Sequence, residues 1–305
     1  MNGMEMARCL YEQQGREALS RAFPELFDRM AIGLAGEGSE CFGFDDAISH
    51  DHDWGAGFCI WLTQDDFHRY GRAVQEVYDS LSPHQLGLPK RMDMPQAGKR
   101  VGCLCMENWY FRYTGGTEGP FSTRDWRNVP EAFLATAVNG EVFSDPLGRF
   151  TAIRKRLLQG YPEDVRNKKL AARAAVMTQA GQYNFPRCRR RRDSVAAQLA
   201  ISEFMRAAMS AAYLLNRRFA PFYKWMHRGL TELTILPQLS GQLASLAAAE
   251  GDMQGTIEDI CINTAAELRR QGLSRQTGSF LLDHCGDIMS HITDPQLRSA
   301  HIMEE

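Results

Sequence analysis

Two short segments combine residue types that can bind a phosphate group and a metal ion. Gly38-Ser39 follows one apolar run, and Asp51 and Asp53 precede the next, which begins at Gly57. A glycine lets backbone N–H groups and a neighbouring hydroxyl approach an anion closely, because it has no side chain to intervene. In an extended segment, residues i and i+2 point to the same side, so Asp51 and Asp53 direct two carboxylates to one place.

Two carboxylates on one side form a site for Mg²⁺, with Mn²⁺ as an alternative ion, that leaves other positions to water and substrate phosphates. With a Gly-Ser turn, this site suits attack on the α-phosphate of a nucleoside triphosphate. Aspartate is also common in turns before strands, so the acidic pair is informative only together with Gly38-Ser39. His50 could reach a phosphate. His52 faces the other way along the strand and is expected to pack inside the domain, because zinc prefers closed sets of nitrogen and sulfur ligands.

Basic residues are concentrated later in the chain. Lys224 lies on a predicted helix that opens at Pro221, and it either adds positive charge to a bound triphosphate or is a solvated lysine beside aromatic residues. The strongest positive cluster consists of Arg187 and residues 189–192. This cluster is either a solvated loop or a surface that contacts a polyanion. RNA as a partner is not favoured, because few aromatic residues are interleaved with these arginines.

The elements that must position these residues change in character along the chain. In the first half, strands are expected at 31–35, 57–62 and 101–106, a helix at about 64–81, and two short β runs at 142–143 and 150–151 around a turn. Strands separated by helices indicate an α/β domain. From about residue 153 the apolar period is helical, with helix starts expected at Pro162-Glu163, Asp193-Ser194 and Pro221. We therefore expect an all-α bundle there, with domains at 1–155 and 156–305.

Composition limits the class of protein without naming a partner. The chain has 305 residues, 44% of them hydrophobic and 24% charged, and a formal net charge of −2. A chain this apolar can bury a core, and whole-chain basicity gives no argument for nucleic-acid binding. No apolar run approaches the roughly 18 residues that span a bilayer, and the N-terminus lacks the layout of a signal peptide. The 8 cysteines are too sparse for a disulfide scaffold, so a cytoplasmic protein with reduced thiols is expected.

Three motifs resemble known families. Gly38-Ser39 followed by Asp51-x-Asp53 resembles the signature of the nucleotidyltransferase superfamily that includes polymerase beta and kanamycin nucleotidyltransferase. The longer sequence from Gly38 to Gly55 resembles that of a nucleotidyltransferase-like family known as domain of unknown function 4037. Gly140-Glu-Val-Phe-Ser-Asp145 looks like the hairpin of that family, and Leu215-Asn-Arg-Arg-Phe-Ala-Pro-Phe-Tyr-Lys-Trp225 looks like its helical motif. The resemblance implies an α+β nucleotidyltransferase-like domain, with a mixed sheet and flanking helices, followed by an all-α helical-bundle domain.

The resemblance also exposes one departure. The superfamily places a third carboxylate on a later strand, where it binds metal or acts as a base toward the acceptor hydroxyl. Gly102 stands at about that position here. Glu107 follows that strand and is a candidate substitute, and the other nearby acids are Glu40, Asp45 and Asp46.

Together these features predict a Mg²⁺-dependent transfer of a nucleoside monophosphate, AMP in the first instance, from a triphosphate to a hydroxyl, with release of pyrophosphate. Asp51 and Asp53 would hold the metal, Gly38 and Ser39 the phosphates, and Lys224 would add charge across a cleft between the domains, where the acceptor is also expected. The alternative is a nucleotide-binding sensor without turnover, which the glycine at position 102 favours.

Overall fold

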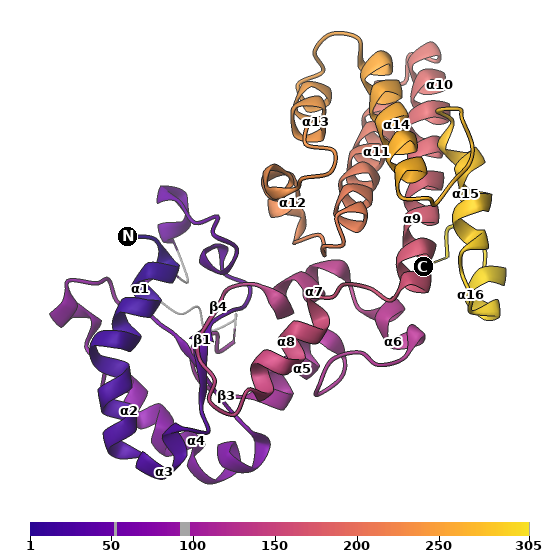
Figure 1. The fold of residues 1–305 in the computed structure, drawn as a ribbon. Helices are drawn as coiled ribbons and strands as arrows, with labels where there is room; N and C mark the ends of the chain where they lie inside the picture. The colour runs from indigo at the N-terminus through magenta and orange to yellow at the C-terminus, as the bar shows by residue number, and fades with distance from the viewer. Residues whose placement is uncertain (52–53, 92–97, 305) are drawn as a thin grey trace. The chain divides into compact units, whose positions relative to one another are not determined.

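The computed structural model describes residues 1–51, 54–91 and 98–304, and the side chains of His50 and Asp51 lie outside that description (Figure 1). Asp53 and His52 also lie outside the described residues. The chain forms two compact units, the first made of residues 1–121 and 133–159 and the second of residues 122–132 and 160–305. The predicted boundary at 155 lies near residue 159, where the chain leaves the first unit for the last time. That residues 122–132 belong to the second unit was not predicted from the sequence.

The first unit is an α+β fold built on a small mixed sheet of four strands. The strands are β1 (Ala31–Leu34), β2 (Cys59–Leu62), β3 (Gly102–Cys105) and β4 (Glu141–Ser144). Their order is β3-β2-β1-β4, with β1 antiparallel to both β2 and β4, and β2 parallel to β3. All residues of β1 and β2 are buried, which explains why these strands are continuous apolar runs. The strands predicted at 31–35, 57–62 and 101–106 are confirmed.

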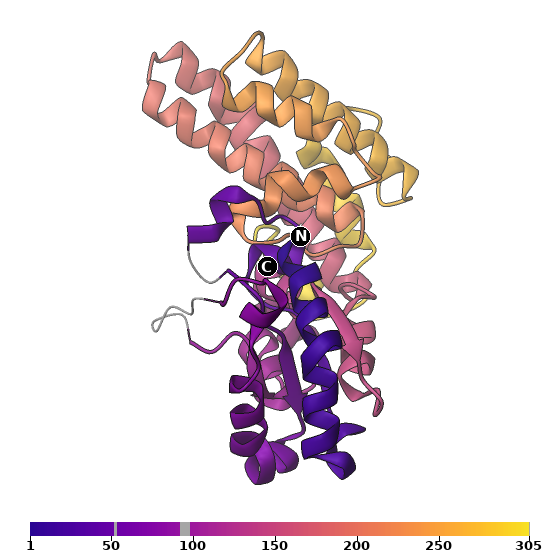
Figure 2. The ribbon, with the colours of Figure 1, turned by 90° about the vertical axis from the view of Figure 1, so that its left-hand side faces the viewer.

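The first unit also contains helices, some of which flank the sheet (Figures 1 and 2). They are α1 (Gly3–Leu10), α2 (Arg16–Ala22), α3 (Pro24–Phe27), α4 (Gln64–Asp79), α5 (Met106–Thr114), α8 (Arg149–Leu157) and α7 (Glu131–Val138), whose first two residues belong to the second unit. A π-helical turn lies at Tyr11–Gly15, and 3₁₀ turns lie at Ser39–Phe42, Ala47–Asp51 and Pro83–Leu86. Helix α4 packs on β2 and β3, and α1 lies against β1. The helix predicted at 64–81 is confirmed as α4, whose start is fixed by the Thr63 side chain accepting from the backbone N–H of Asp66.

One predicted strand is wrong. Residues 150–151 were expected to form the second arm of a β-hairpin, but they lie in the first turn of α8. Gly148 precedes this helix with a φ of 69°, and the Asp145 carboxylate accepts from the backbone N–H of Thr151 at 2.7 Å. Phe150 is still a core residue, since its ring stacks on Trp61 at 4.0 Å between centroids. A buried aromatic side chain fits either a strand or a helix, and here the helix start at Gly148 decides between them.

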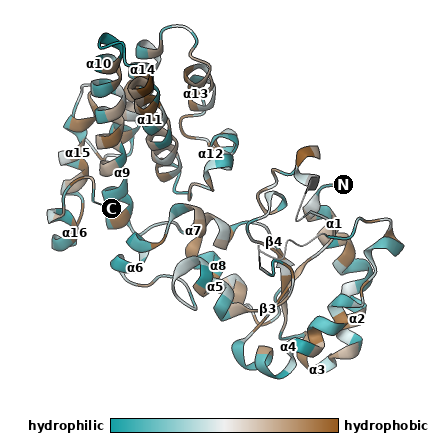
Figure 3. Cartoon of the chain, turned by 180° about the vertical axis from the view of Figure 1, so that it is seen from behind, coloured by the Kyte–Doolittle hydropathy of each residue, from teal (hydrophilic) through white to brown (hydrophobic). Residues whose placement is uncertain are grey.

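The second unit is helical, with no strand among its described residues. Its helices are α6 (Thr123–Asn128), α9 (Glu163–Met177), α10 (Phe185–Arg190), α11 (Ser194–Leu215), α12 (Tyr223–Gly229), α13 (Leu239–Ala247), α14 (Met253–Arg270), α15 (Leu281–Ser290) and α16 (Pro295–Ser299), with a π-helical segment at Thr178–Asn184 and a 3₁₀ turn at Leu230–Glu232. Helix α9 packs against α11 and α15. Helix α11 is rich in hydrophobic residues, and α10 is hydrophilic (Figure 3).

The helix starts predicted for this unit are mostly confirmed. The Asp193 carboxylate accepts from the backbone N–H of Ala196 at 2.9 Å and caps α11, and α9 begins directly after Pro162. Helix α12 begins at Tyr223 rather than at Pro221. Within the described ranges, no helix is both long and apolar enough to cross a membrane.

Candidate functional site

The pairing of the strands brings the chemically interesting segments to one end of the sheet. Gly33 near the end of β1 pairs with Cys59 at the start of β2, and Cys59 also pairs with Gly102 at the start of β3. The segment after β1, which carries Gly38-Ser39, and the segment that leads from Asp51-x-Asp53 into β2 therefore meet the sheet at the same end. Lys99 and Arg100, which precede β3, reach it there as well.

The Gly38-Ser39 turn is present, but the space beside Gly38 is occupied. Ser39 begins a 3₁₀ turn, and Gly38 before it is extended, with φ −66° and ψ 148°. A Cβ atom added at Gly38 would lie 2.3 Å from a carboxylate oxygen of Glu40. The sequence suggested that Gly38 leaves room for a phosphate; in this structure, the room accommodates the Glu40 side chain.

Glu40 is held there by a buried ion pair. Its Oε1 atom lies 3.0 Å from Nη1 of Arg91, and the two side chains are 4% and 5% exposed. A buried carboxylate is tolerated only with such a partner, because removing an ion from water is costly. Through Glu40, the Gly-Ser turn is therefore held by an ion pair to Arg91, which lies far from it in the sequence. Glu40 was a candidate third acid, and this pairing gives it a structural role.

A small polar pocket, here called the Gly-Ser pocket, opens beside this turn. It is lined by Gly38 and Trp109 and by six charged residues, Glu37, Glu40, Arg91, Lys99, Arg100 and Arg112. Four basic side chains against two acidic ones make its surroundings positive, as an anion site requires. Its volume is about 20 Å³, enough for roughly one water molecule. A triphosphate would therefore have to displace side chains to enter it.

Glu37 forms ion pairs with two of the basic residues that line the Gly-Ser pocket. Its carboxylate lies 2.7 Å from Nη2 of Arg112 and 3.5 Å from Nη2 of Arg100, and accepts a hydrogen bond from the Tyr113 hydroxyl at 3.3 Å. Burial and, secondarily, the negative charge of Glu37 raise the pKa of Tyr113 above its usual range, so this hydroxyl stays protonated. Sequence reasoning missed Glu37. Its place directly before Gly38-Ser39 was the available signal.

Position 102 is unfavourable for any side chain in this conformation. Gly102 has a φ of 86°, which disfavours any residue with a side chain, and an added Cβ would lie 2.6 Å from the Gln75 amide oxygen. That oxygen accepts from the backbone N–H of Cys103 at 2.8 Å, which holds Gln75 in place.

The other candidate acids have different partners. Glu107 follows the far end of β3, where Cys105 pairs with Leu62, and its carboxylate lies 3.5 Å from Nη2 of Arg149. The structure therefore does not bring Glu107 to the end of the sheet that carries Gly38-Ser39. The Asp45 carboxylate accepts from the backbone N–H of Gly3 at 2.7 Å, and Asp46 accepts from Ile48 and Ser49 in its own turn.

The side chains of the predicted metal ligands lie outside the described part of the structure. Asp51 ends the 3₁₀ turn Ala47–Asp51, with its side chain outside the description, and Asp53 lies outside it entirely. Among the residues that are described, no group of three or more His, Cys, Asp or Glu side chains could hold a metal ion. An all-oxygen aspartate pair remains the donor set that suits Mg²⁺.

Cysteine chemistry is disfavoured in this part of the first unit. Cys41, Cys59 and Cys103 are buried. Burial raises the pKa of Cys59 to about 12 and that of Cys103 to about 12, so both remain neutral thiols at physiological pH. A neutral buried thiol is a poor nucleophile and a poor metal ligand.

The predicted basic residues of the second unit lie on its surface. Lys224 is exposed in the first turn of α12, and its Nζ atom lies 5.1 Å from the ring centroid of Trp225. The arginine cluster forms the end of α10 and the turn after it, where the Arg187 guanidinium lies 3.7 Å from the ring centroid of Tyr183. These positions are consistent with solvent-exposed side chains both at Lys224 and in the arginine cluster. The predicted contacts of these residues with a triphosphate or a polyanion remain predictions.

Comparison with known proteins gives one match. The model of the family described as Domain of unknown function (DUF4037) matches residues 126–226. No curated protein and no solved structure matches the chain. The matched residues include both later motifs, Gly140–Asp145 and Leu215–Trp225, but not the segment from Gly38 to Gly55. The match therefore supports the resemblance to this family of unknown function over residues 126–226.

Proposed function

We propose that the first unit binds a nucleoside triphosphate, ATP in the first instance, and transfers its nucleoside monophosphate to a hydroxyl acceptor. In this reaction the acceptor oxygen bonds to the α-phosphorus, the bond from that phosphorus to the pyrophosphate oxygen breaks, and the acceptor loses its proton. The observation that carries the proposal is the meeting of the Gly38-Ser39 turn, the basic Gly-Ser pocket and the start of β2 at one end of the sheet. Asp51-x-Asp53 lies shortly before that strand in the sequence.

Each group has a proposed task. The backbone and hydroxyl of Ser39 bind phosphate oxygens, and Arg100 and Arg112 supply positive charge to the same phosphates. Asp51 and Asp53 would hold Mg²⁺, which supplies charge neutralisation on the phosphates when bound. Glu37 keeps the two arginines in place before the nucleotide arrives and gives them up when phosphate oxygens replace its carboxylate.

The experiment compares nucleotide-dependent thermal stabilisation of the full chain. Wild type with Mg²⁺ and a nonhydrolysable ATP analogue at 100 times its Kd should gain about 2.7 kcal/mol of stability. The double substitution Asp51→Asn plus Asp53→Asn should abolish the Mg²⁺-dependent part of that gain. Asp259→Asn plus Asp283→Asn is the matched control, because both aspartates are exposed on helices of the second unit and the change in net charge is the same. Equal Mg²⁺-dependent gains in the two double variants would refute the site.

A nucleotide-binding sensor is the second candidate, and a specific observation favours it. The φ of Gly102 and the Gln75 side chain disfavour a carboxylate at position 102, which is about where the resemblance leads us to expect one. Incubation with labelled ATP, CTP, GTP and UTP, Mg²⁺ and a panel of hydroxylated acceptors separates the two. Pyrophosphate release supports transfer, whereas nucleotide-dependent stabilisation without pyrophosphate release supports the sensor.

A further inference from the structure

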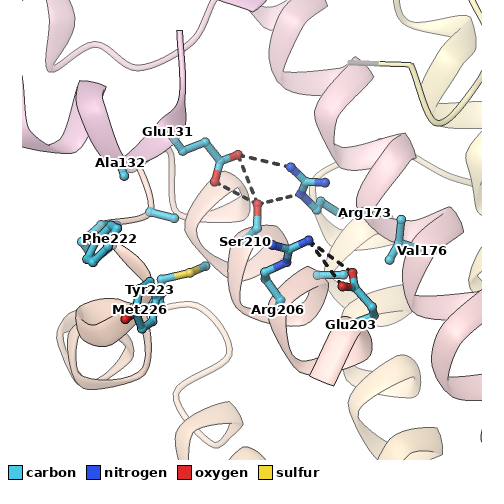
Figure 4. Close-up of a pocket in the computed structure, with 13 residues that line it drawn as sticks. Glu131, Ala132, Arg173, Val176, Glu203, Arg206, Ser210, Phe222, Tyr223 and Met226 are labelled. Atoms are coloured by element: carbon cyan, nitrogen blue, oxygen red, sulfur yellow. Dashed lines mark hydrogen bonds and ion pairs between the residues drawn. The ribbon is translucent and has the colours of Figure 1, made fainter. Parts of the chain in front are cut away.

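The second unit contains a cavity of its own, of about 550 Å³ (Figure 4). It is formed by helices α9, α11 and α12 and by Glu131 and Ala132 at the start of α7, all within the second unit. Its volume is in the range of pockets that bind small organic molecules. We call it the helical-unit cavity. None of its residues lines the Gly-Ser pocket.

A chain of hydrogen bonds forms one polar wall of the helical-unit cavity. Nε of Arg173 donates to the Ser210 hydroxyl at 2.8 Å, and this hydroxyl donates to the Glu131 carboxylate at 3.0 Å. Nη2 of Arg173 also lies 3.9 Å from the same carboxylate. Ser210 is only 4% exposed, so its position is set by these partners. The wall thus offers fixed polar atoms whose opposite charges compensate each other, which suits a neutral hydroxyl or amino group.

A second pair of charged residues lies beside this wall but is held loosely. Arg206 and Glu203 lie one turn apart on α11, with Nη2 3.3 Å from Oε2, and their side chains are 68% and 56% exposed. An exposed pair at this spacing is worth about 0.5 kcal/mol or less. An anionic group of a ligand can therefore replace Glu203 at Arg206 with little loss, and the guanidinium can bind a planar anion through two N–H groups.

The third feature is an apolar wall with two exposed rings. Phe222 and Tyr223 lie side by side, with 4.4 Å between their ring centroids, and are 51% and 72% exposed. Met226 is buried and lines the same cavity (Figure 4). Aromatic side chains at a cavity favour a ligand with a flat ring, because offset stacking adds to the burial of apolar surface.

We propose that the helical-unit cavity binds a small organic anion with an aromatic body. The anionic group pairs with Arg206, the ring packs on Phe222, Tyr223 and Met226, and a hydroxyl or amino substituent reaches Ser210 and Glu131. This binding site does not depend on nucleotidyl transfer, since every residue in it belongs to the second unit.

The test uses the full chain and two fluorescent probes. One is 8-anilinonaphthalene-1-sulfonate, an aromatic anion, and the other is N-phenyl-1-naphthylamine, which has the same ring system without the sulfonate. Wild type should bind the sulfonate saturably with one site per chain. Arg206→Met should weaken the sulfonate about tenfold or more and leave the neutral probe nearly unchanged, because only a charge-assisted contact is lost. Arg206→Lys should recover most of the affinity.

Two further variants locate the site. Tyr223→Ala should weaken both probes, because it removes stacking surface that the two share. Arg190→Met is the matched control, since Arg190 is an exposed arginine of the same unit that does not line the helical-unit cavity. Unchanged sulfonate binding in Arg206→Met, or an equal loss in Arg190→Met, would overturn the proposal. Asp51→Asn plus Asp53→Asn should bind the sulfonate as wild type does, so failure of the nucleotide site would be seen separately.

Discussion

The buried pair of Glu40 and Arg91 predicts a large and local loss of stability when one partner is removed. The two side chains are 4% and 5% exposed, with 3.0 Å between Oε1 and Nη1. Arg91→Met keeps much of the apolar stem but leaves the Glu40 carboxylate buried without this arginine. Breaking a buried pair in this way costs about 3–5 kcal/mol. Arg72 and Glu76 provide the control, because they also lie 3.0 Å apart but are 94% and 64% exposed. Arg72→Met should therefore cost no more than about 0.5 kcal/mol.

The assay is hydrogen exchange followed by mass spectrometry, since a chain of two compact units need not unfold in one step. Peptides covering β1 and β2 should exchange roughly a hundredfold faster or more in Arg91→Met, because 1.4 kcal/mol corresponds to a factor of ten. Peptides of α11, in the other unit, serve as the internal reference. The double variant Glu40→Gln plus Arg91→Met should recover most of the protection, because no unpaired charge remains. Equal exchange of β1 and β2 in Arg91→Met and Arg72→Met would refute the reasoning.

Four further predictions follow from single residues. Gly102→Ala should destabilise the first unit by about 1–3 kcal/mol, because of its φ of 86° and the nearby Gln75 amide, and an unchanged melting temperature would contradict this. Glu37→Gln should tighten ATP binding in calorimetry, since it frees Arg100 and Arg112 for phosphate; weaker binding would argue against the phosphate site. At Asp164 burial raises the pKa, but hydrogen bonds from Thr293 and Asp294 outweigh it, so the pKa is lowered; its contribution to stability exists above the ordinary carboxyl pKa and is lost as the pH falls through the lowered one. Asp164→Asn should therefore lower the melting temperature at pH 7, and the loss should become smaller as the pH falls below the ordinary carboxyl pKa; a loss that does not change with pH would contradict it. Lys224→Ala should weaken ATP binding if the predicted charge contact forms, with Arg190→Met as the control, and unchanged binding would assign Lys224 to the solvated surface.

Local signals in the sequence were sufficient for the strands of the sheet, for α4 and for several helix starts of the second unit. The strands Ala31–Leu34, Cys59–Leu62 and Gly102–Cys105 follow from short apolar runs, because a strand buried on both faces needs no alternation. The start of α11 follows from Asp193, whose side chain can replace a missing backbone acceptor. Residues 150–151 did not follow such rules, since two residues are too few to show a period, and the helix that begins after Gly148 includes them.

By itself, the sequence predicted a type of chemistry and part of the order of the elements, because residue identity fixes which atoms could bind phosphate or metal, and Gly38-Ser39 and Asp51-x-Asp53 provide such atoms. Only the tertiary structure decided which charges meet. In the folded chain, Glu40 pairs with Arg91, and Glu37 pairs with both Arg100 and Arg112. Glu107 lies at the other end of the sheet, and the Gln75 side chain occupies the space beside position 102. Pairings between residues distant in the chain depend on strand register and helix packing, and a sequence pattern of local period carries neither.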